Sequence, residues 1–285
     1  MNNSKAVQQY LLSRIQLPES QGEIESIVYA VLAHFFQLTH TDVLRDKPIT
    51  ISNEQVKLLD TVIARINKHE PIQYITGVAW FYRRSFDVSP AVLIPRPETE
   101  ELIQEVIAHA KQRGLVAAHI LDLCTGSGCV PVTLGLEIPK SKVLATDISD
   151  EALAVARMNA DKHGVAVDFH KHNILTDPIT LTNFDIITAN PPYIRESEKA
   201  GMSPNVLDFE PHLALFVPED DPLVFYKVIA KKANGALRHD GMLIVEVNEH
   251  FGHAVADIFV SEGFLKIEIV YDLSQKQRIV RGIKA

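Results

Sequence analysis

Residues 120–128, Ile-Leu-Asp-Leu-Cys-Thr-Gly-Ser-Gly, have the pattern of a buried strand that runs into a glycine-rich turn. The glycines at positions 126 and 128 allow positive φ angles and a close approach of the backbone to a ligand. The residues that follow favour a helix, so a strand–turn–helix unit is expected here. Such a turn is weakly specific by itself, because several kinds of nucleotide-binding fold contain one.

Two details of the sequence narrow the choice of ligand for this turn. The dinucleotide-binding fingerprint has Gly or Ala three positions after the second glycine, where this chain has Pro131, and the Gly-Lys-Ser/Thr of a P-loop is missing. Asp147 lies 19 positions after Gly128, at the end of the next expected strand, where a carboxylate can bind both hydroxyls of a ribose. This combination favours S-adenosylmethionine. Asp122 either holds the ligand's ammonium group or orients the turn; plain turn-capping is its structural alternative.

The chain beyond Glu98 alternates between helical and β-branched segments, which predicts an α/β sheet with helices on both faces. We expect strands at residues 119–123, 142–146, 167–170, 184–189, 242–247 and 266–271. We expect helices at residues 99–113, 129–137, 150–163, 222–233 and 252–262.

The N-terminal part, residues 1–70, is expected to form a small all-helical domain. Ser52 and Gln55 have the spacing of a capping box, which marks a helix start. One face of that helix is indicated by apolar residues at intervals of three and four: Val56, Leu59, Val62, Ile63 and Ile66. Residues 71–95 are interpreted as a β-hairpin-like connector, and residues 96–285 as the α/β domain.

The composition excludes several classes of protein. With 285 residues, 46% of them hydrophobic, the chain can form one large core and a smaller one. The longest apolar stretch, residues 27–36, is too short to cross a bilayer, and no secretory signal is evident, so we expect no membrane association. The two cysteines do not suggest a disulfide framework, which favours the cytoplasm. The net charge of −8 makes nucleic acid an unfavourable partner, and the scattered histidines predict no metal site.

A second motif, Asn190-Pro191-Pro192-Tyr193, directly follows the strand expected at residues 184–189. Ligands of open α/β sheets bind at the carboxyl ends of the strands, so this loop should lie beside the glycine-rich turn. Asn-Pro is also a common start of a plain turn, which is the structural alternative for the isolated tetrapeptide.

The residue types of this loop suit methylation of a planar nitrogen. An amide or aromatic amine is a poor nucleophile, because its lone pair is delocalised. The side-chain carbonyl of Asn190 and the free carbonyl of Pro191 can accept hydrogen bonds from the two N–H groups of the acceptor. These bonds aim its nitrogen at a sulfonium methyl group. These hydrogen bonds strengthen as the nitrogen gains positive charge. Tyr193 offers a flat face on which a planar group can stack.

With these motifs, nearly the whole chain resembles the PrmC/HemK family of peptide chain release factor protein-(glutamine-N5) methyltransferases. The segments that carry the resemblance are Pro71–Gly77, Ile94–Glu100, the glycine-rich turn, Asn190–Ile194 and Phe209–Pro211. Asn-Pro-Pro-Tyr alone is shared with adenine-N6 DNA methyltransferases, whereas Pro-Arg-Pro-Glu-Thr-Glu and Phe-Glu-Pro are typical of the glutamine enzymes.

The resemblance implies a Rossmann-like class I methyltransferase domain with a mostly parallel seven-stranded sheet, preceded by a helical domain that helps to dock the substrate. It implies methylation of the glutamine in the Gly-Gly-Gln motif of class 1 release factors, which act in translation termination, with S-adenosyl-L-homocysteine as product. It also implies a monomer. The implied catalytic residues are Asn190, Pro191 and Tyr193. The implied substrate-binding residues are Asn190, Pro191, Pro192 and Tyr193. The implied cofactor contacts are Cys124, Thr125, Gly126, Ser127, Gly128, Asp147, Ile174 and Asn190.

The chain departs from the family pattern at two places. Cys124 stands where the turn usually begins with Gly, so this residue must tolerate the local backbone. Asn173-Ile174 replaces the acidic and aromatic pair that is common around the adenine; Asn173 can still bind the adenine amino group and Ile174 can pack on the ring.

Two other functions compete with this interpretation. An adenine-N6 methyltransferase acting on DNA or RNA would stack a flipped base on Tyr193, but it needs a phosphate-binding surface that the acidic composition does not suggest. A non-catalytic binding protein would keep the fold without the chemistry. The complete glycine-rich turn and Asp147 argue against it, and so does the complete loop Asn190–Tyr193, which we call the acceptor loop.

Overall fold

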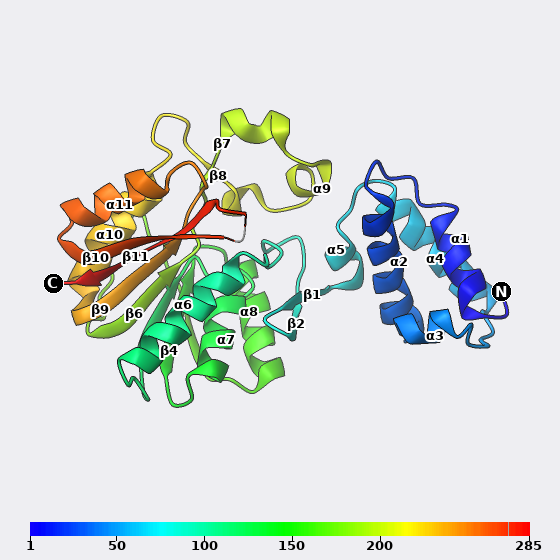
Figure 1. Ribbon diagram of the computed structural model, residues 1–285, viewed down its shortest axis with the longest axis horizontal. Helices are drawn as coiled ribbons and strands as arrows, with labels where there is room; N and C mark the ends of the chain where they lie inside the picture. Colours follow the sequence, from blue (N-terminus) through cyan, green and yellow to red (C-terminus); the bar gives the residue numbers. More distant parts are fainter. Residues whose placement is uncertain (273) are drawn as a thin grey trace. The chain divides into compact units, whose positions relative to one another are not determined.

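The computed structural model describes residues 1–272 and 274–285. Its described residues divide into two compact units: Met1–Val78 with Ser203–Phe209, and Ala79–Met202 with Glu210–Ala285. The first unit is helical, and the second contains the large sheet (Figure 1). Within the described residues, every helix is too short or too polar to cross a membrane.

The first unit is built from short helices around one apolar core. Its helices are α1 (Ser4–Leu12), α2 (Gln21–Phe36), α3 (His40–Leu44), α4 (Asn53–Ile66), α5 (Ile72–Thr76) and, from the later segment, α9 (Pro204–Leu207). The predicted capping box at the start of α4 is present, since Ser52 and Gln55 bond reciprocally. The predicted apolar face of α4 is buried at Leu59, Val62, Ile63 and Ile66. This face packs into the core of the unit.

The range expected as a hairpin-like connector begins differently from the prediction. Residues 72–76 form α5, because Pro71 precedes the helix with φ near −56° and Gly77 ends it in the left-handed region. The two-stranded sheet itself is shorter and consists of β1 (Val78–Phe81) and β2 (Arg84–Asp87).

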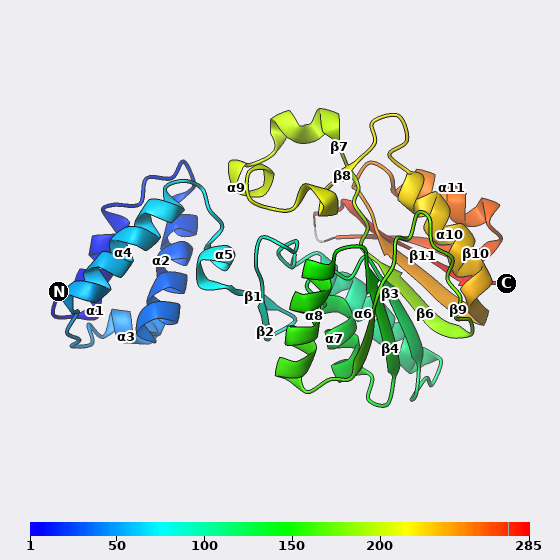
Figure 2. The same cartoon turned by 180° about the vertical axis from the view of Figure 1, so that it is seen from behind.

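The second unit contains, within the described residues, a sheet of seven strands in the order β10-β11-β9-β6-β3-β4-β5 (Figures 1 and 2). The neighbours from β9 to β5 pair in parallel, and β11 pairs antiparallel with both β9 and β10. The predicted mostly parallel sheet is therefore confirmed. The strands are β3 (His119–Leu123), β4 (Lys142–Asp147), β5 (Val167–Lys171), β6 (Phe184–Ala189), β9 (Leu237–Glu246), β10 (Phe264–Tyr271) and β11 (Gln277–Lys284).

Helices cover both faces of this sheet, as the alternating pattern predicts. They are α6 (Thr99–Gln112), α7 (Cys129–Glu137), α8 (Asp150–His163), α10 (Val224–Ala236) and α11 (Gly252–Ser261). Between β6 and α10 lie the short elements β7 (Ile194–Arg195), η1 (Glu196–Gly201), η2 (His212–Ala214) and β8 (Phe216–Val217), and β7 pairs with β8.

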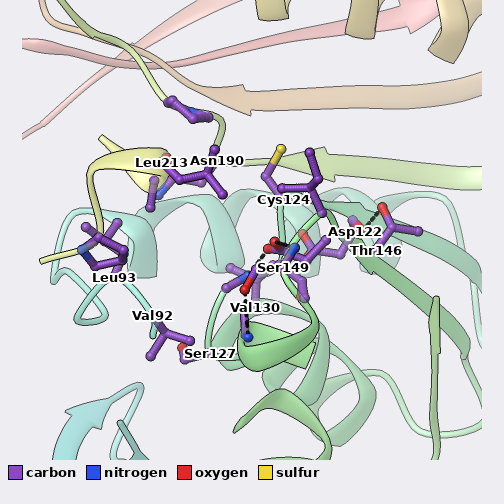
Figure 3. Close-up of a pocket in the computed structure, with 18 of the residues that line it drawn as sticks. Val92, Leu93, Asp122, Cys124, Ser127, Val130, Thr146, Ser149, Asn190 and Leu213 are labelled. Atoms are coloured by element: carbon purple, nitrogen blue, oxygen red, sulfur yellow. Dashed lines mark hydrogen bonds between the residues drawn. The ribbon is translucent and has the colours of Figure 1, made fainter. Parts of the chain in front are cut away.

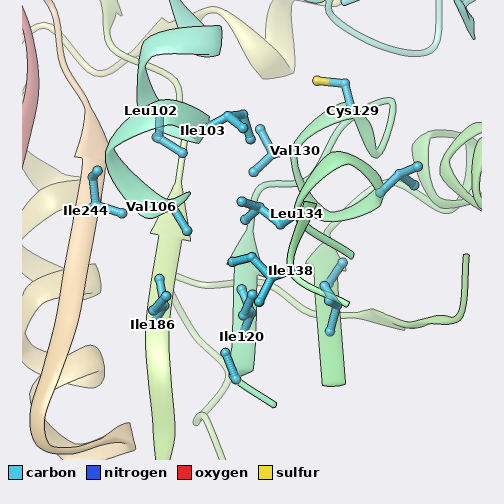
Figure 4. Close-up of a cluster of buried hydrophobic side chains, with 14 of the residues drawn as sticks. Leu102, Ile103, Val106, Ile120, Cys129, Val130, Leu134, Ile138, Ile186 and Ile244 are labelled. Carbon is cyan, nitrogen blue, oxygen red and sulfur yellow. The ribbon is translucent and has the colours of Figure 1, made fainter. Parts of the chain in front are cut away.

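Two hydrophobic clusters fill the spaces between the helices and the sheet. Successive residues of a strand point to opposite faces, so Ile186 joins the cluster under α6, α7 and α8, whereas Ile187 joins the cluster under α10 and α11. Figure 4 shows the first cluster, where Leu102 and Val106 of α6 face the strands that carry Ile186 and Ile244. Strand β6 is buried over its whole length, which fixes the loop that follows it at the centre of the sheet.

The glycine-rich turn is held against helix α8 by a close contact. Gly128 has φ of +78°, and a Cβ atom added there would lie 2.9 Å from the Cβ of Ala156. Gly164 at the end of α8 has φ of +65°, but a Cβ atom there would meet nothing within 4 Å. Both glycines thus adopt a left-handed backbone that disfavours other residues. Of the two, only Gly128 also lies where a side chain would collide with a neighbour.

We therefore expect Gly128→Ala to destabilise the protein more than Gly164→Ala. The second variant should lose about 1 kcal/mol from the left-handed backbone, and the first about 2–3 kcal/mol because the contact with Ala156 adds to this cost. Urea unfolding of both variants beside the wild type measures the difference. Equal losses would show that the contact between the turn and α8 is without consequence.

Candidate active site

A cavity opens at the carboxyl edge of the parallel strands (Figure 3). Leu123 at the end of β3 pairs with Thr146 of β4 and with Ala189 of β6, so the loops after these three strands emerge side by side. Figure 3 shows Asn190 beside Leu213 on one side of the cavity and Ser127 on the opposite side.

Most of the predicted site residues line this one cavity. These are Cys124, Thr125, Gly126, Ser127, Asp147, Ile174, Asn190 and Pro192. Three predicted residues are not among the lining residues: Gly128, Pro191 and Tyr193. Gly128 instead packs its backbone on α8. The predicted direct contact of Gly128 with the cofactor stays a prediction.

The turn has the backbone that its sequence requires, and Asp147 holds it in place. Cys124 adopts φ of +59°, so a non-glycine residue does occupy the left-handed region at this position. The Asp147 carboxylate accepts hydrogen bonds from the Gly126 N–H at 2.8 Å and from the Ser149 N–H at 3.0 Å. Each carboxylate oxygen has a further lone pair, so Asp147 can orient the turn and also accept bonds from ligand hydroxyls. Burial raises the pKa of Asp147, and the backbone donors act against this shift.

Asp122 is a buried carboxyl group beside the cavity, with its side chain only partly paired. Its Oδ1 accepts a hydrogen bond from the Thr188 hydroxyl at 2.6 Å. Its Oδ2 and the Thr125 hydroxyl have no partner within hydrogen-bonding geometry among the described residues, although the nearby Thr125 hydroxyl acts to lower the pKa of Asp122. Burial raises the pKa of Asp122 to about 7. An unpaired buried carboxyl costs free energy, which a cationic ligand group in the cavity would offset.

The region expected around an adenine is shaped by a local turn. The Asn173 side-chain oxygen accepts a hydrogen bond from the Leu175 N–H at 3.0 Å, and the Asn173 N–H donates to Asp177 at 2.9 Å. Ile174 is nearly buried and lines the cavity, so it offers an apolar surface on which a ring can pack.

The acceptor loop has Asn190 at the cavity and Tyr193 in a supporting position. The Tyr193 hydroxyl donates to Glu246 at 3.2 Å, and its ring packs against the cluster under α10 and α11. Burial and the neighbouring Glu246 raise the pKa of Tyr193 well above its usual value. The backbone N–H groups of Tyr193 and Ile194 donate to the Leu215 carbonyl. The idea that a planar substrate stacks on Tyr193 stays a prediction.

One wall of the cavity is fixed by an ion pair between a partly exposed arginine and a buried glutamate. Glu210 accepts hydrogen bonds from the Arg96 guanidinium at 2.5 Å and from the Ile94 N–H at 3.3 Å. This pair joins the segment that lines the cavity at Arg96 to the segment that lines it at Pro211. The arginine of Pro-Arg-Pro-Glu-Thr-Glu and the glutamate of Phe-Glu-Pro are thus paired with each other.

Two buried polar residues near the site were not singled out from the sequence. Asn159 on α8 is fully buried, accepts from the Asp87 N–H and donates to the carbonyls of Asp87 and Ser127, so it holds the glycine-rich turn to β2. Glu246 ends β9 and is 2% exposed. A lone carboxylate at the end of the apolar run 242–245 is the signal that could have identified Glu246.

Comparisons with known proteins identify the family of the chain. The PrmC N-terminal domain matches residues 12–77, and the methyltransferase small domain matches residues 98–206. A release factor glutamine methyltransferase from Bacteroides thetaiotaomicron is 38% identical over 281 residues, which cover 98% of this chain and 99% of the relative. The chain belongs to the release factor glutamine methyltransferase family. A second member of this family, from Flavobacterium psychrophilum, is 38% identical over 92% of both chains.

The fold of this family member is shared with a solved methyltransferase from Pyrococcus furiosus. The TM-score is 0.50 at 16% sequence identity, and the match covers 82% of this chain and 100% of that chain. The chain is a methyltransferase that uses S-adenosylmethionine.

The cavity of this methyltransferase fits that cofactor. A Cβ atom added at Gly126 would meet nothing within 4 Å, so the turn leaves open space at a cavity-lining position. The buried oxygens of Asp122 and Thr125 without partners among the described residues can bind polar groups of the ligand. Asp147 would hold the ribose hydroxyls, and Ile174 would pack on the adenine.

The raised pKa of Asp122 predicts a pH-dependent cost in the ligand-free methyltransferase. As the pH rises from about 4 to about 7, the unfolded state loses the Asp122 proton before the folded state does, so the folded state becomes relatively less stable. The difference in unfolding free energy between Asp122→Asn and the wild type should therefore shift in favour of the variant by about 2–3 kcal/mol between pH 5 and pH 8. Urea denaturation at the two pH values measures this gain.

The same variant should bind S-adenosylmethionine more weakly, because it lacks the carboxylate that faces the cavity. Isothermal titration calorimetry at pH 8 measures this affinity. Parallel pH profiles of the two proteins, together with unchanged affinity, would contradict the assignment of Asp122.

Proposed function

We propose that this methyltransferase transfers the methyl group of S-adenosylmethionine to the side-chain amide nitrogen of the glutamine in the Gly-Gly-Gln motif of class 1 peptide chain release factors. The observation that carries the proposal is that Asn190 lines the same cavity as the glycine-rich turn and Asp147. The names of the relatives that match nearly the whole chain support the choice of substrate.

The acceptor loop supplies what an amide needs in order to react. S-adenosylmethionine, when bound, supplies an electrophilic methyl group. The Asn190 Oδ1 and the Pro191 carbonyl oxygen accept hydrogen bonds from the two N–H groups of the glutamine amide. These bonds direct the amide nitrogen toward the cavity. Positive charge develops on the nitrogen during transfer, so both hydrogen bonds strengthen in the transition state. The nitrogen then loses one proton to water.

The charge and composition of the chain fit a protein substrate better than a nucleic acid. The net charge of −8 does not provide the clustered cations that phosphate binding needs. We infer that the enzyme acts as a monomer in the cytoplasm, where release factors function in translation termination. The Asn-Pro-Pro-Tyr loop is the part of the chain that binds the glutamine, and the helical N-terminal residues 1–70 dock the rest of the release factor.

The substrate is tested by transfer of labelled methyl groups. The enzyme is incubated with methyl-labelled S-adenosylmethionine and one of three acceptors: an intact class 1 release factor, the same factor with Gly-Gly-Gln changed to Gly-Gly-Ala, or duplex DNA. We expect label in the intact release factor alone. Label in DNA would overturn the proposal in favour of an adenine methyltransferase, and label in both release factor proteins would place the modified residue elsewhere.

Removal of the Asn190 side chain should abolish turnover and retain most of the cofactor affinity. Asn190→Ala deletes one of the two carbonyls that hold the acceptor amide, and a lost transition-state hydrogen bond in such a site costs about 100-fold or more in kcat. Single-turnover methylation of the release factor measures the chemical step, and calorimetry measures cofactor binding. If the variant methylates at the wild-type rate, Asn190 is not a catalytic residue.

A further inference from the structure

A chain of hydrogen bonds runs from Asn190 into the protein interior. The Asn190 Nδ2 donates to the Thr99 hydroxyl at 3.4 Å, and the Thr99 hydroxyl donates to the Glu246 Oε2 at 2.6 Å. The Tyr193 hydroxyl donates to the other carboxylate oxygen, Oε1, at 3.2 Å. Thr99 and Glu246 are 3% and 2% exposed, so the bond between them lies in the protein interior.

This chain of hydrogen bonds joins the ends of two neighbouring strands and the start of one helix. Ala189 of β6 pairs with Val245 of β9, so Asn190 and Glu246 follow at corresponding positions. Thr99 is the first residue of α6 and lines the cavity together with Asn190. Glu246 is not among the lining residues, so its influence on the cavity passes through Thr99 and Tyr193.

The direction of the hydrogen bonds decides which end of the Asn190 carboxamide faces the substrate. The two ends of a carboxamide have nearly the same shape, and a half-turn exchanges the oxygen and the NH2 group. When Glu246 is ionised, its carboxylate can only accept, so the Thr99 proton is donated to it and the Thr99 oxygen is left as an acceptor. An Asn190 oxygen turned toward it would face lone pairs, whereas the NH2 group finds an acceptor. The carboxamide oxygen is thereby left for the amide N–H of the substrate.

We propose that Thr99 and Glu246 are positioning residues that fix the orientation of the Asn190 carboxamide, so that its oxygen is presented to the acceptor amide. This inference rests on the proposed function for the identity of the acceptor. It assigns a role to the threonine of the Pro-Arg-Pro-Glu-Thr-Glu motif and to a carboxylate at the end of β9. Neither residue transfers a proton or contacts the methyl group.

Substitution of Thr99 tests the orientation directly. Thr99→Val removes the only hydroxyl that links Asn190 to Glu246 in the described contacts, so the carboxamide can take both orientations. We expect kcat for the release factor to fall, up to about 100-fold as for other losses of alignment, with little change in S-adenosylmethionine affinity. Thr99→Ser keeps the hydroxyl and should restore most of the turnover.

A matched control is available on the neighbouring helix. Thr133 of α7 is fully buried, and its hydroxyl has no hydrogen-bond partner among the described residues. Thr133→Val is the same chemical change in a buried helical position, so it should retain wild-type kcat. If Thr133→Val and Thr99→Val lower kcat equally, the loss reflects general packing and the positioning role is wrong.

Glu246 is tested by a double-mutant cycle. Glu246→Met removes both acceptor oxygens and keeps a side chain of similar length. The cycle is made in a Tyr193→Phe background, which already lacks the other hydroxyl bonded to Glu246. If Thr99 and Glu246 act as one unit, Thr99→Val combined with Glu246→Met should there lower kcat no further than Thr99→Val alone. Additive losses would contradict a shared role. Thermal unfolding of each variant shows whether it folds. If a Glu246 variant does not fold, the comparison of Thr99→Ser with Thr99→Val tests the positioning role.

A measurement without substrate separates this inference from the proposed function. In 15N-labelled enzyme, the side-chain NH2 signal of Asn190 is assigned by its loss in Asn190→Ala. Its hydrogen exchange with water should be slower in the wild type and in Thr99→Ser than in Thr99→Val. Equal exchange in all three proteins would overturn the positioning role. Slow exchange without methylation of any release factor would support the positioning role and count against the proposed substrate.

Discussion

The parallel pairing of β6 with β3 on one side and with β9 on the other is the constraint on which the site depends. Register in a parallel sheet determines which residues leave the strands at the same level. Here it brings the glycine-rich turn after Leu123, the acceptor loop after Ala189 and the carboxylate of Glu246 to one edge. A shift of β6 by one residue would reverse its buried faces and move Asn190 away from Thr99.

The site combines several buried carboxyl groups, and each has a different task. Asp147 is bonded to the backbone of the turn, which makes it part of the scaffold, and its remaining lone pairs are free to accept bonds from ligand hydroxyls. Asp122 has an unpaired oxygen among the described residues and suits a cationic ligand. Burial raises the pKa of Glu246, while the hydroxyls of Thr99 and Tyr193 lower it. Burial of these carboxyl groups has an electrostatic cost, which a cationic ligand group beside Asp122 can offset.

Local sequence predicted much of this fold, because the central strands and helices are apolar and end at clear turn residues. The expected ranges 119–123 and 184–189 coincide with β3 and β6, and 129–137 with α7. Strand β11 escaped prediction because charged residues and Gly282 interrupt its apolar pattern. The start of β9 lay before its expected range for a similar reason, since Arg238, His239 and Asp240 are polar.

Most residues that the motifs nominated for the site line the cavity, whereas the contacts that hold them could not be predicted. Thr99 and Glu246 are 147 residues apart in the chain, and Asn159 reaches Asp87 across 72 residues. Such pairs depend on tertiary packing, which a spacing rule does not describe. Tyr193 shows the same limit, because its residue type suggested a stacking surface and the fold directs its hydroxyl to Glu246.

The central claim is that paired carbonyl oxygens hold the glutamine amide and aim it at the methyl donor. A crystal structure of the enzyme with S-adenosyl-L-homocysteine and a Gly-Gly-Gln peptide tests it most directly. The account predicts the Asn190 Oδ1 and the Pro191 carbonyl oxygen within about 3 Å of the glutamine amide nitrogen, with the Asn190 Nδ2 on the Thr99 hydroxyl. A glutamine bound elsewhere, or an Asn190 side chain turned out of the cavity, would contradict it.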